Sequence, residues 1–340
     1  AQKPLTDYVN PMLGTATLWD SVDLGFKPTK RTWGAEVFPG SSLPNAMVQV
    51  SPVTKFHSGA GYQYEDSVIY GFTHTNKGHW NLCHIPLLPV TGTPTPGDYC
   101  SPFSHERESA APGYYQVFLD RYGVDAQLST TLRCAFHKYT YPAGAAASLL
   151  ADLQRSNEHV RAWDIRKEGD NVFAGWQQTG EKMYFYAVAN RPVTGIEPVV
   201  EGDREVRIVR FGEGDGALEL RIGFSFVSEK NARENLEAEM LGKSFAEVRS
   251  EATATWNDLL GRIRVEGGTE REKGLFYSSL YRSFLWPALR SDVNGEFTDV
   301  DGKVINPGFR YYTGPSYWDD YRNKLILLGM LAPDVAADVI

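Results

Sequence analysis

The feature that most constrains this 340-residue chain is a change of pattern at Ser228. Before it, from about residue 45 to 226, short runs rich in Val, Ile, Tyr and Phe are separated by Gly, Pro and Asp clusters. Regular short strands with turn signals predict a large antiparallel β-sandwich. The predicted strands are 46–50, 69–74, 113–119, 128–141, 172–179, 183–190, 205–211 and 217–226.

The pattern beyond Ser228 is helical. Charged stretches that carry alanine and leucine cover 228–241 and 244–263, and Gly242 between them is a typical C-terminal stop. We interpret these stretches as linker helices, and we expect a short strand at 264–266 after them.

A stronger helix signal follows. Thr269 and Glu272 have the spacing of a capping box, and the residues behind them place an apolar stripe on one helix face. The polar, glycine-containing segment 295–312 is expected to form a hairpin, and a helix over 316–331 is expected after it. The apolar stripe consists of Phe276, Leu280 and Phe284.

The last residues, from Pro333 to Ile340, have the pattern of one more helix without a C-terminal cap. Two or three amphipathic helices cannot bury their apolar faces alone. We therefore expect further helical partners beyond residue 340. The predicted domains are a β-sandwich at 1–228, linker helices at 229–263, and the start of a helical domain at 264–340.

Charge and hydropathy exclude two classes of partner. The chain has 42 Asp and Glu against 34 Lys and Arg, a net charge of −8, and this argues against nucleic acid, which needs a basic face. The uncharged stretch 37–54 is broken by Pro39, Pro44 and Pro52. No segment is therefore expected to insert into a membrane.

The cysteines and the N-terminus indicate the compartment. Cys83, Cys100 and Cys134 are odd in number and lack C-x-x-C spacing, so neither a zinc site nor a dense disulfide framework is expected. The chain begins Ala-Gln-Lys without Met, as a protein does after removal of a signal peptide. This favours a secreted or periplasmic protein of the exported bacterial type.

Several blocks spread in order along the chain carry a family resemblance. They lie at 8–15, 37–52, 69–75, 86–92, 103–108 leading into 112–115, and 317–322. Together they resemble glycoside hydrolase family 92, the secreted calcium-dependent α-mannosidases, and they cover the whole chain. The chain departs from the family pattern at 76–84 and at Asn45-Ala46, which leaves the linkage preference open.

The resemblance implies a fold and a mechanism. The fold would be a β-sandwich that leads through linker helices into an (α/α)6 barrel. The reaction would remove terminal mannose with inversion. One carboxylic acid would protonate the glycosidic oxygen, and a second carboxylate would activate a water molecule on the opposite face of the sugar. The two groups would lie ~6.5–9.5 Å apart, which leaves room for that water. Ca²⁺ would hold sugar hydroxyls. In the family the acid, the base and the calcium ligands come from later in the barrel, so we expect them beyond residue 340.

Asp319 and Arg322 lie three apart in a predicted helix, so they share a face. On spacing alone, an ion pair within the helix is the simplest interpretation. The resemblance implies instead that Trp318 and Asp319 belong to the sugar pocket, with Asp319 binding hydroxyls of the cleaved mannose. Arg322 is a further candidate for substrate binding.

The loop residues His79, Trp80 and Asn81 are the second group of candidates. A loop tryptophan can simply pack as a lid over the sandwich, but the resemblance implies that Trp80 contacts the leaving sugar. His74, His79 and His84 look like metal ligands, yet no nearby carboxylate has H-E-x-x-H spacing, so zinc is not expected.

Two further pairs have weaker signals. Gly14 and Thr15 form a turn whose backbone could donate hydrogen bonds to substrate, or could be a plain turn. Glu106 and Glu108 alternate in sequence, and in a strand they would point to one face. They would then lie too close for inverting catalysis, and we interpret them as structural.

Two other classes of protein remain as alternatives. A non-catalytic carbohydrate-binding module would consist of the sandwich alone, and the helical region counts against it. Another enzyme built from a sandwich and a barrel, such as a phosphorylase or polysaccharide lyase, is the second alternative. A phosphorylase would need a cluster of Arg, Lys or Ser groups for its anion, and the sequence shows none.

Overall fold

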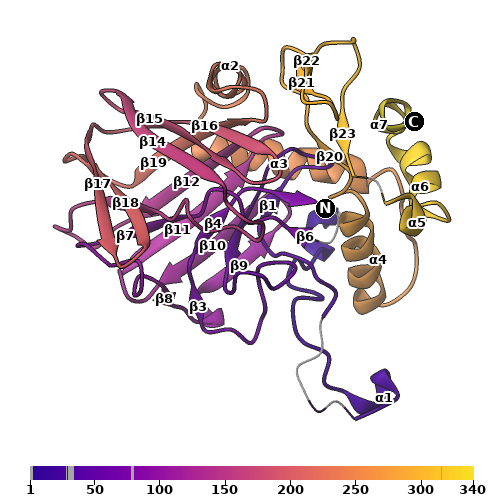
Figure 1. The fold of residues 1–340 in the computed structure, drawn as a ribbon. Helices are drawn as coiled ribbons and strands as arrows, with labels where there is room; N and C mark the ends of the chain where they lie inside the picture. The colour runs from indigo at the N-terminus through magenta and orange to yellow at the C-terminus, as the bar shows by residue number, and fades with distance from the viewer. Residues whose placement is uncertain (1–2, 28, 30–33, 78–79, 315) are drawn as a thin grey trace.

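The computed structural model describes residues 3–27, 29, 34–77, 80–314 and 316–340. Two large antiparallel sheets pack face to face, and helices cover one side of the pair and continue to the C-terminus (Figure 1). The predicted order, β-sandwich first and helices after it, is confirmed.

The first sheet has seven strands. In spatial order it contains β1 (Ser41–Ser42), β2 (Gln49–Val53), β4 (Gly71–Thr73), β7 (Leu87–Val90), β13 (Ser148–Ala151), β18 (Arg204–Phe211) and β17 (Val193–Glu201). β17 and β18 form a local hairpin, but β7, β13 and β18 are neighbours from distant parts of the chain, and their pairing has no local sequence signal.

The second sheet has eight strands. Buried and partly exposed residues alternate strictly along β16, as expected for a strand with one face in the core. In spatial order the sheet contains β14 (Ala162–Gly169), β15 (Val172–Gln178), β16 (Lys182–Ala189), β19 (Leu218–Ser225), β12 (Cys134–Thr140), β11 (Val124–Thr130), β10 (Tyr114–Leu119) and β9 (Glu108–Ala111).

Four short strand pairs of the described chain lie outside the two large sheets. They are β3 (Val68–Ile69) with β8 (Ser101–Pro102), β5 (Asn76–Lys77) with β6 (Trp80–Asn81), β20 (Ala288–Leu289) with β23 (Tyr312–Thr313), and β21 (Phe297–Thr298) with β22 (Val304–Ile305). The last pair is the hairpin predicted in 295–312.

The helices of the described chain are η1 (Leu5–Tyr8), α1 (Ser21–Leu24), η2 (His105–Arg107), α2 (Glu229–Glu239), α3 (Phe245–Leu260), α4 (Glu270–Ser283), α5 (Tyr317–Asp320), α6 (Lys324–Leu331) and α7 (Pro333–Val339). The longest of them, α2 to α4, follow the sandwich directly, and shorter helices lie near both ends of the chain. None of the helices in the described residues is long and apolar enough to cross a membrane.

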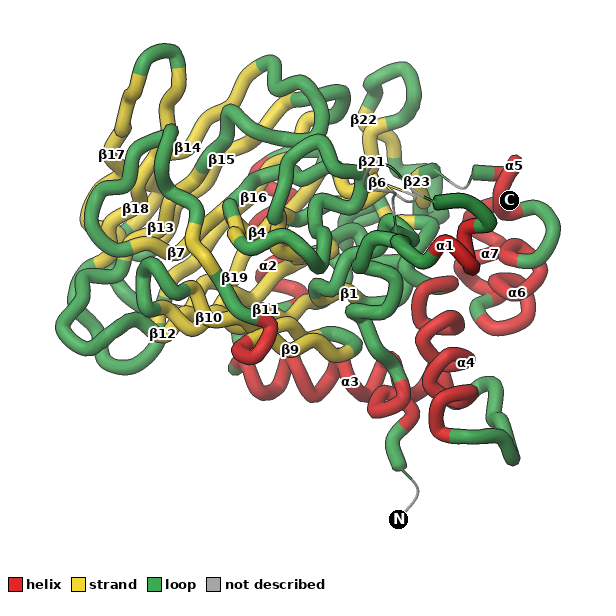
Figure 2. The backbone as a smooth tube through the Cα atoms, turned by 90° about the horizontal axis from the view of Figure 1, so that it is seen from below, coloured by secondary structure: helices red, strands yellow, loops and turns green. Residues whose placement is uncertain are grey.

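Local capping chemistry starts the longer helices. The Ser228 side chain accepts a hydrogen bond from the Asn231 backbone at the start of α2. Ser244 begins α3 with a complete capping box, and Thr269 begins α4 in the same way, as predicted. The α2 and α3 helices pack on the outer face of the eight-stranded sheet (Figure 2).

A second hydrophobic core lies between the helices. It joins Trp256 of α3, Tyr277 and Tyr281 of α4, and Leu328 of α6. Val9 and Phe38 from the N-terminal segment belong to the same core. The start of the chain therefore packs against its helical end.

Four predicted elements are wrong. The strand expected at 69–74 is divided between β3 and β4, which belong to different sheets. The strand expected at 128–141 is two strands, because Thr131 closes a tight turn onto Cys134. Residues 264–266 form no strand. The helix expected over 316–331 breaks after α5, where Asn323 leaves the helical region with φ −123°. Asn competes for backbone hydrogen bonds and disfavours helix interiors.

Two predicted face assignments also need correction. Glu106 is exposed in η2, whereas Glu108 is buried at the start of β9, so the two do not share a face. A 3₁₀ turn does not have the two-residue period of a strand. On α4, Leu280 and Phe284 are buried but Phe276 is partly exposed, because the stripe facing the core is centred on Tyr277 and Tyr281.

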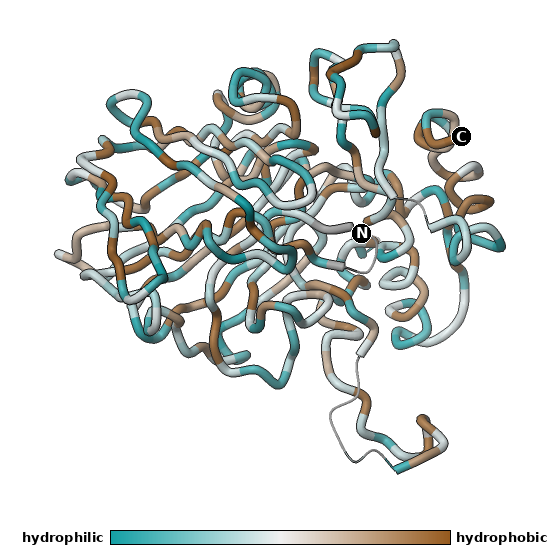
Figure 3. Tube along the Cα trace, viewed as in Figure 1, coloured by the Kyte–Doolittle hydropathy of each residue, from teal (hydrophilic) through white to brown (hydrophobic). Residues whose placement is uncertain are grey.

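Apolar side chains also lie on exposed elements. Figure 3 shows hydrophobic segments on α6 and on the projecting arm that carries α1. Ile326 and Met330 of α6 are exposed, as are Val22 and Phe26 of the arm.

Candidate functional site

A cleft of about 290 Å³ opens where the N-terminal segment meets the end of α4 and the single turn of α5. It brings two neighbouring carboxylates together with basic and aromatic side chains. Its lining includes Glu36, Phe38, Arg282, Trp286, Asp319, Asp320 and Lys324.

Ser316 fixes the carboxylate of Asp319. The Ser316 hydroxyl donates to Asp319 Oδ2 at 2.7 Å. The Ser316 carbonyl accepts hydrogen bonds from the backbone N–H groups of Asp319 and Asp320, at 2.9 and 2.8 Å. Asp319 is therefore held at the start of α5, where the N–H groups of the first turn also favour a negative charge.

Lys324 lies beside Asp320 at the start of α6. The distance from Lys324 Nζ to Asp320 Oδ1 is 4.0 Å, and both side chains are mostly buried. Burial lowers the pKa of Lys324 to about 8, and the neighbouring Asp320 carboxylate opposes part of that shift. The cleft thus has an ammonium donor beside two carboxylate acceptors.

Gly14 supports the opposite wall of the cleft. Its carbonyl accepts a hydrogen bond from the Ala35 N–H at 2.9 Å, and its φ of +93° favours glycine. A Cβ at this position would lie 2.9 Å from the Ala35 Cβ. The structure therefore gives Gly14 a role in placing residues 35–37, which line the cleft.

Arg282 ties the same wall to α4. Its guanidinium donates to the backbone carbonyls of Pro11, Leu13 and Phe38, with distances of 3.4 Å to Leu13 and 2.9 Å to Phe38. Burial lowers the pKa of this arginine. The bonds to three carbonyls hold the N-terminal segment against the helices.

Thr15 follows Gly14, but the turn itself uses its hydrogen-bond donors. The Thr15 N–H and hydroxyl both donate to the Met12 carbonyl, at 3.0 and 2.7 Å. The Thr15 carbonyl accepts from the Tyr64 N–H at 3.1 Å. These bonds favour the plain turn, and a contact between Thr15 and substrate stays a prediction.

Trp318 and Arg322 are exposed and do not line the cleft. The Trp318 side chain is 85% exposed. Arg322 Nε donates to the Tyr321 hydroxyl at 2.8 Å. Within the described residues Asp319 and Arg322 form no ion pair, because the helix breaks between α5 and α6. Of the three candidates in this segment, the structure brings Asp319 to the cleft.

The hairpin of β5 and β6 holds the other candidates. His79 lies outside the described residues, and of Trp80 only the backbone in β6 is described. Asn81 is buried, and its side-chain oxygen accepts a hydrogen bond from the Cys83 N–H at 2.8 Å. Sugar contacts by these three residues stay predictions.

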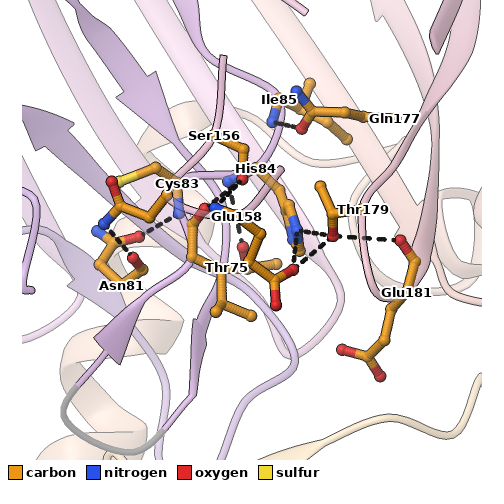
Figure 4. Close-up of polar contacts among 12 residues, drawn as sticks. Thr75, Asn81, Cys83, His84, Ile85, Ser156, Glu158, Gln177, Thr179 and Glu181 are labelled. Atoms are coloured by element: carbon orange, nitrogen blue, oxygen red, sulfur yellow. Dashed lines mark hydrogen bonds and ion pairs between the residues drawn. The ribbon is translucent and has the colours of Figure 1, made fainter. Parts of the chain in front are cut away.

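A polar network begins beside this hairpin and extends to Thr179 and Glu181 (Figure 4). His84 Nε2 is 2.9 Å from the Thr179 hydroxyl and 3.3 Å from Glu158 Oε2. The Thr179 backbone N–H donates to the Glu181 carbonyl at 2.9 Å. The network therefore connects the chain around 75–85 to the turn between β15 and β16.

Sequence reasoning missed Asp320 and Lys324. A spacing of four residues signals a pair only within one continuous helix. Here the helix breaks at Asn323 between the two residues, so the fold and not the spacing brings them together. It missed the group of His84, Glu158 and Thr179 because these residues are distant in sequence and only the fold brings them together.

The described residues do not identify a calcium site. Among them, no group of three or more His, Cys, Asp or Glu side chains could hold a metal ion. Asp319 and Asp320 are only two carboxylates, and Asp320 already faces Lys324.

Comparison with known families decides the identity of the fold. Residues 8–235 match the glycosyl hydrolase family 92 N-terminal domain, and residues 231–340 match the catalytic domain of the same family. The chain belongs to glycosyl hydrolase family 92. The resemblance inferred from the sequence blocks is confirmed.

Solved family 92 structures have the same architecture. A family GH92 α-mannosidase from Bacteroides thetaiotaomicron is 26% identical and superimposes with a TM-score of 0.88 over 99% of this chain and 48% of its own. An inverting mannosidase of the same family from Bacteroides thetaiotaomicron VPI-5482 is 25% identical, with a TM-score of 0.84 over 100% of this chain and 48% of its own.

Among curated proteins, an uncharacterized secreted glycosidase of Arthroderma benhamiae is 24% identical over 85% of this chain and 42% of its own length. This family 92 chain therefore spans about half the length of the relatives it matches. The match to the catalytic domain covers 231–340, which includes most of α2 and all of α3 to α7.

Proposed function

We propose that the protein is an α-mannosidase that removes terminal α-linked mannose from glycans. The observation that carries this proposal is the unbroken family 92 match from residue 8 to 340, together with the likeness to solved α-mannosidases. One of these, from Bacteroides thetaiotaomicron, is described in complex with mannoimidazole. Since the chain spans about half of these relatives, the catalytic acid and base are expected outside residues 1–340.

In this proposal the cleft at α5 holds part of the mannose residue. The Asp319 carboxylate accepts hydrogen bonds from sugar hydroxyls, and Ser316 fixes its orientation. Asp320 and Lys324 add an acceptor and a donor within the same cleft. Hydrogen bonds to charged groups contribute about 1.5–3 kcal/mol each, so such a group can fix one sugar orientation.

The stereochemistry belongs to the proposal as well. We expect inversion, in which one carboxylic acid protonates the leaving oxygen and a second carboxylate activates water on the opposite face. The support is the family resemblance and the relative described as an inverting mannosidase. Calcium dependence rests on the family resemblance alone, with ligands expected outside these residues.

We also propose that the protein is exported from the cell. The relative from Arthroderma benhamiae is described as a secreted glycosidase. An exported enzyme of this kind would act on mannose-containing glycans. The acidic net charge of the chain disfavours nucleic acid as a partner.

The proposal is tested by following an aryl α-mannoside with the full-length protein by proton NMR. We expect β-mannose as the first product, because inversion at an α-linkage gives the β-anomer. Chelation should stop the release and added Ca²⁺ should restore it. If α-mannose appears first, the inverting mechanism is wrong. If glycans bind but no mannose is released, the protein is a non-catalytic carbohydrate-binding protein.

A further inference from the structure

A second cavity, of about 540 Å³, lies between the turn that joins β15 to β16, the end of β19 and the hairpin of β21 and β22. We call it the Arg290 cavity. Its volume is within the range of small-molecule sites, about 300–1,000 Å³. Besides Arg290, its lining includes Glu181, Lys182, Tyr184, Asp299 and Tyr311.

Arg290 is buried in this wall with two donors unused. Arg290 is only 2% exposed, and its guanidinium lies 4.2 Å from the centre of the Phe226 ring. Nη1 donates to the Leu289 carbonyl at 3.3 Å. Nε and Nη2 have no hydrogen-bond acceptor among the described residues. A buried donor without an acceptor is costly, so an acceptor from a ligand would stabilise it.

Glu181 is the charged neighbour of this guanidinium, but it does not satisfy it. Glu181 Oε2 is 3.7 Å from Arg290 Nη2, too far for a hydrogen bond. The Glu181 side chain is 40% exposed. Its backbone is held by Thr179, whose hydroxyl belongs to the network in Figure 4. Arg290 and Glu181 thus form a loose ion pair without a hydrogen bond between them.

The charge of the cavity favours a neutral ligand. Arg290 and Lys182 are balanced by Glu181 and Asp299. Lys182 Nζ is already placed 3.9 Å from the Trp176 ring. A phosphate or carboxylate would gain from Arg290 but would meet two carboxylates in the same cavity, and like charges repel.

The ligand also has aromatic walls available. Tyr184 and Tyr311 line the cavity, and Tyr311 is stacked on Phe297 with ring centres 4.6 Å apart. An aromatic ring offers a flat apolar face, and pockets for small molecules combine such faces with a few polar groups that fix orientation.

We propose that the Arg290 cavity is a second glycan-binding site, which holds a neutral pyranose by two adjacent hydroxyls between Arg290 and Glu181. One hydroxyl oxygen accepts from Nε–H and Nη2–H, and its neighbour donates to the Glu181 carboxylate. The identity of the sugar as mannose rests on the proposed function. The site itself is separate from the cleft that contains Asp319.

The test measures binding in the Asp319→Asn background with a chelator present, so that neither mannose release nor the cleft at α5 contributes to the signal. Calorimetric titration of the full-length protein with α-mannotriose should show weaker binding after Glu181→Ala, by about tenfold for one lost hydrogen bond to a charged group. Glu168→Ala is the matched control, because Glu168 lies in the same sheet, is 37% exposed and pairs with Arg166. This control should bind as the wild type does.

Arg290→Met keeps a long side chain without the donors and should weaken binding as Glu181→Ala does. If this buried substitution prevents folding, the exposed Glu181→Ala variant still decides. Unchanged α-mannotriose affinity in Glu181→Ala overturns the proposed site, whether or not the protein releases mannose. If inorganic phosphate binds and competes with α-mannotriose, the proposal that the cavity takes a neutral ligand is wrong. A mannosidase assay with an aryl α-mannoside reports separately on the proposed function.

Discussion

Two buried histidines, His74 and His137, form a continuous hydrogen-bonded chain in the sandwich core. The Tyr139 hydroxyl lies 2.6 Å from His137 Nδ1, the two Nε2 atoms are 2.9 Å apart, and His74 Nδ1 is 2.9 Å from the Ile85 carbonyl. The carbonyl can only accept, so His74 donates from Nδ1 and accepts at Nε2. Every group then has a partner while both rings are neutral.

This chain predicts a loss of stability in mild acid. Burial lowers the pKa of His74 from 6.5 to about 3 and lowers that of His137 as well. Below pH 6.5 the unfolded state therefore binds protons that the folded state does not, so stability falls as the pH drops from 6.5 toward 3. Between pH 6.5 and 5 the free energy of unfolding should fall by about 2 kcal/mol on account of His74, and His137 should add to the fall in the same direction; urea unfolding measures it.

The matched comparison is His74→Gln against His159→Gln. His159 is exposed, so its replacement should leave the pH dependence of the unfolding free energy as in the wild type. His74→Gln should be less stable at pH 7.5 but should show a smaller change between pH 7.5 and 5. An equal change in both variants would contradict this account of the histidines.

At the scale of elements, the attachment of α2 to the sandwich depends on a glycine. Gly223 of β19 has ordinary strand backbone, but a Cβ there would lie 2.1 Å from the Ala232 carbonyl oxygen and 2.8 Å from the Leu236 Cβ of α2. Helix backbone and strand are therefore in direct contact. Asn235 of α2 adds a side-chain hydrogen bond to the Phe224 carbonyl at 2.7 Å.

Gly223→Ala should therefore separate α2 from the sheet. We expect a loss of about 1–3 kcal/mol in the free energy of unfolding, the usual cost of overpacking. Gly195→Ala in β17 is the matched control, since nothing lies within 4 Å of its Cβ position. Thermal or urea unfolding compares the two. Equal stability of both variants would show that α2 tolerates a shift from the strand.

Elements with local signals could be predicted, and those without could not. Ser244 and Thr269 begin helices because a capping box needs only four consecutive residues. Strand β17 gave no signal, because it is an edge strand with exposed residues on both faces and lacks alternation. The break between α5 and α6 was also missed, since the hydrophobic pattern continues through it.

At the scale of the whole molecule, the sandwich and the helices share contacts that sequence patterns do not show. Trp256 Nε1 of α3 donates to the Ser42 carbonyl at 2.8 Å, and Arg282 bonds the N-terminal segment. These partners are more than 200 residues apart. The boundaries at 228 and 263 stay predictions, but the cleft at α5 exists only because the chain start returns to the helices.

The candidate site was predictable only in part. Asp319 was found through its family block, and the structure places it in the cleft. The opposite wall, formed by 35–38 and Arg282, could not be predicted, because residues so distant in sequence meet only in the folded chain. Gly14 was selected as a possible backbone donor to substrate, whereas in the structure it positions residues 35–37, which line the cleft.

The measurement that tests the central claim most directly compares Asp319→Asn with Asp258→Asn in the full-length protein. Asp258 is an exposed carboxylate on α3 that pairs with Arg262, so its replacement should leave the hydrolysis of an aryl α-mannoside unchanged. Asp319→Asn should lower kcat/KM by about 10- to 100-fold, the effect of one hydrogen bond to a charged group, with no change in melting temperature. Equal kcat/KM for both variants would contradict the assignment of Asp319 to the mannose site.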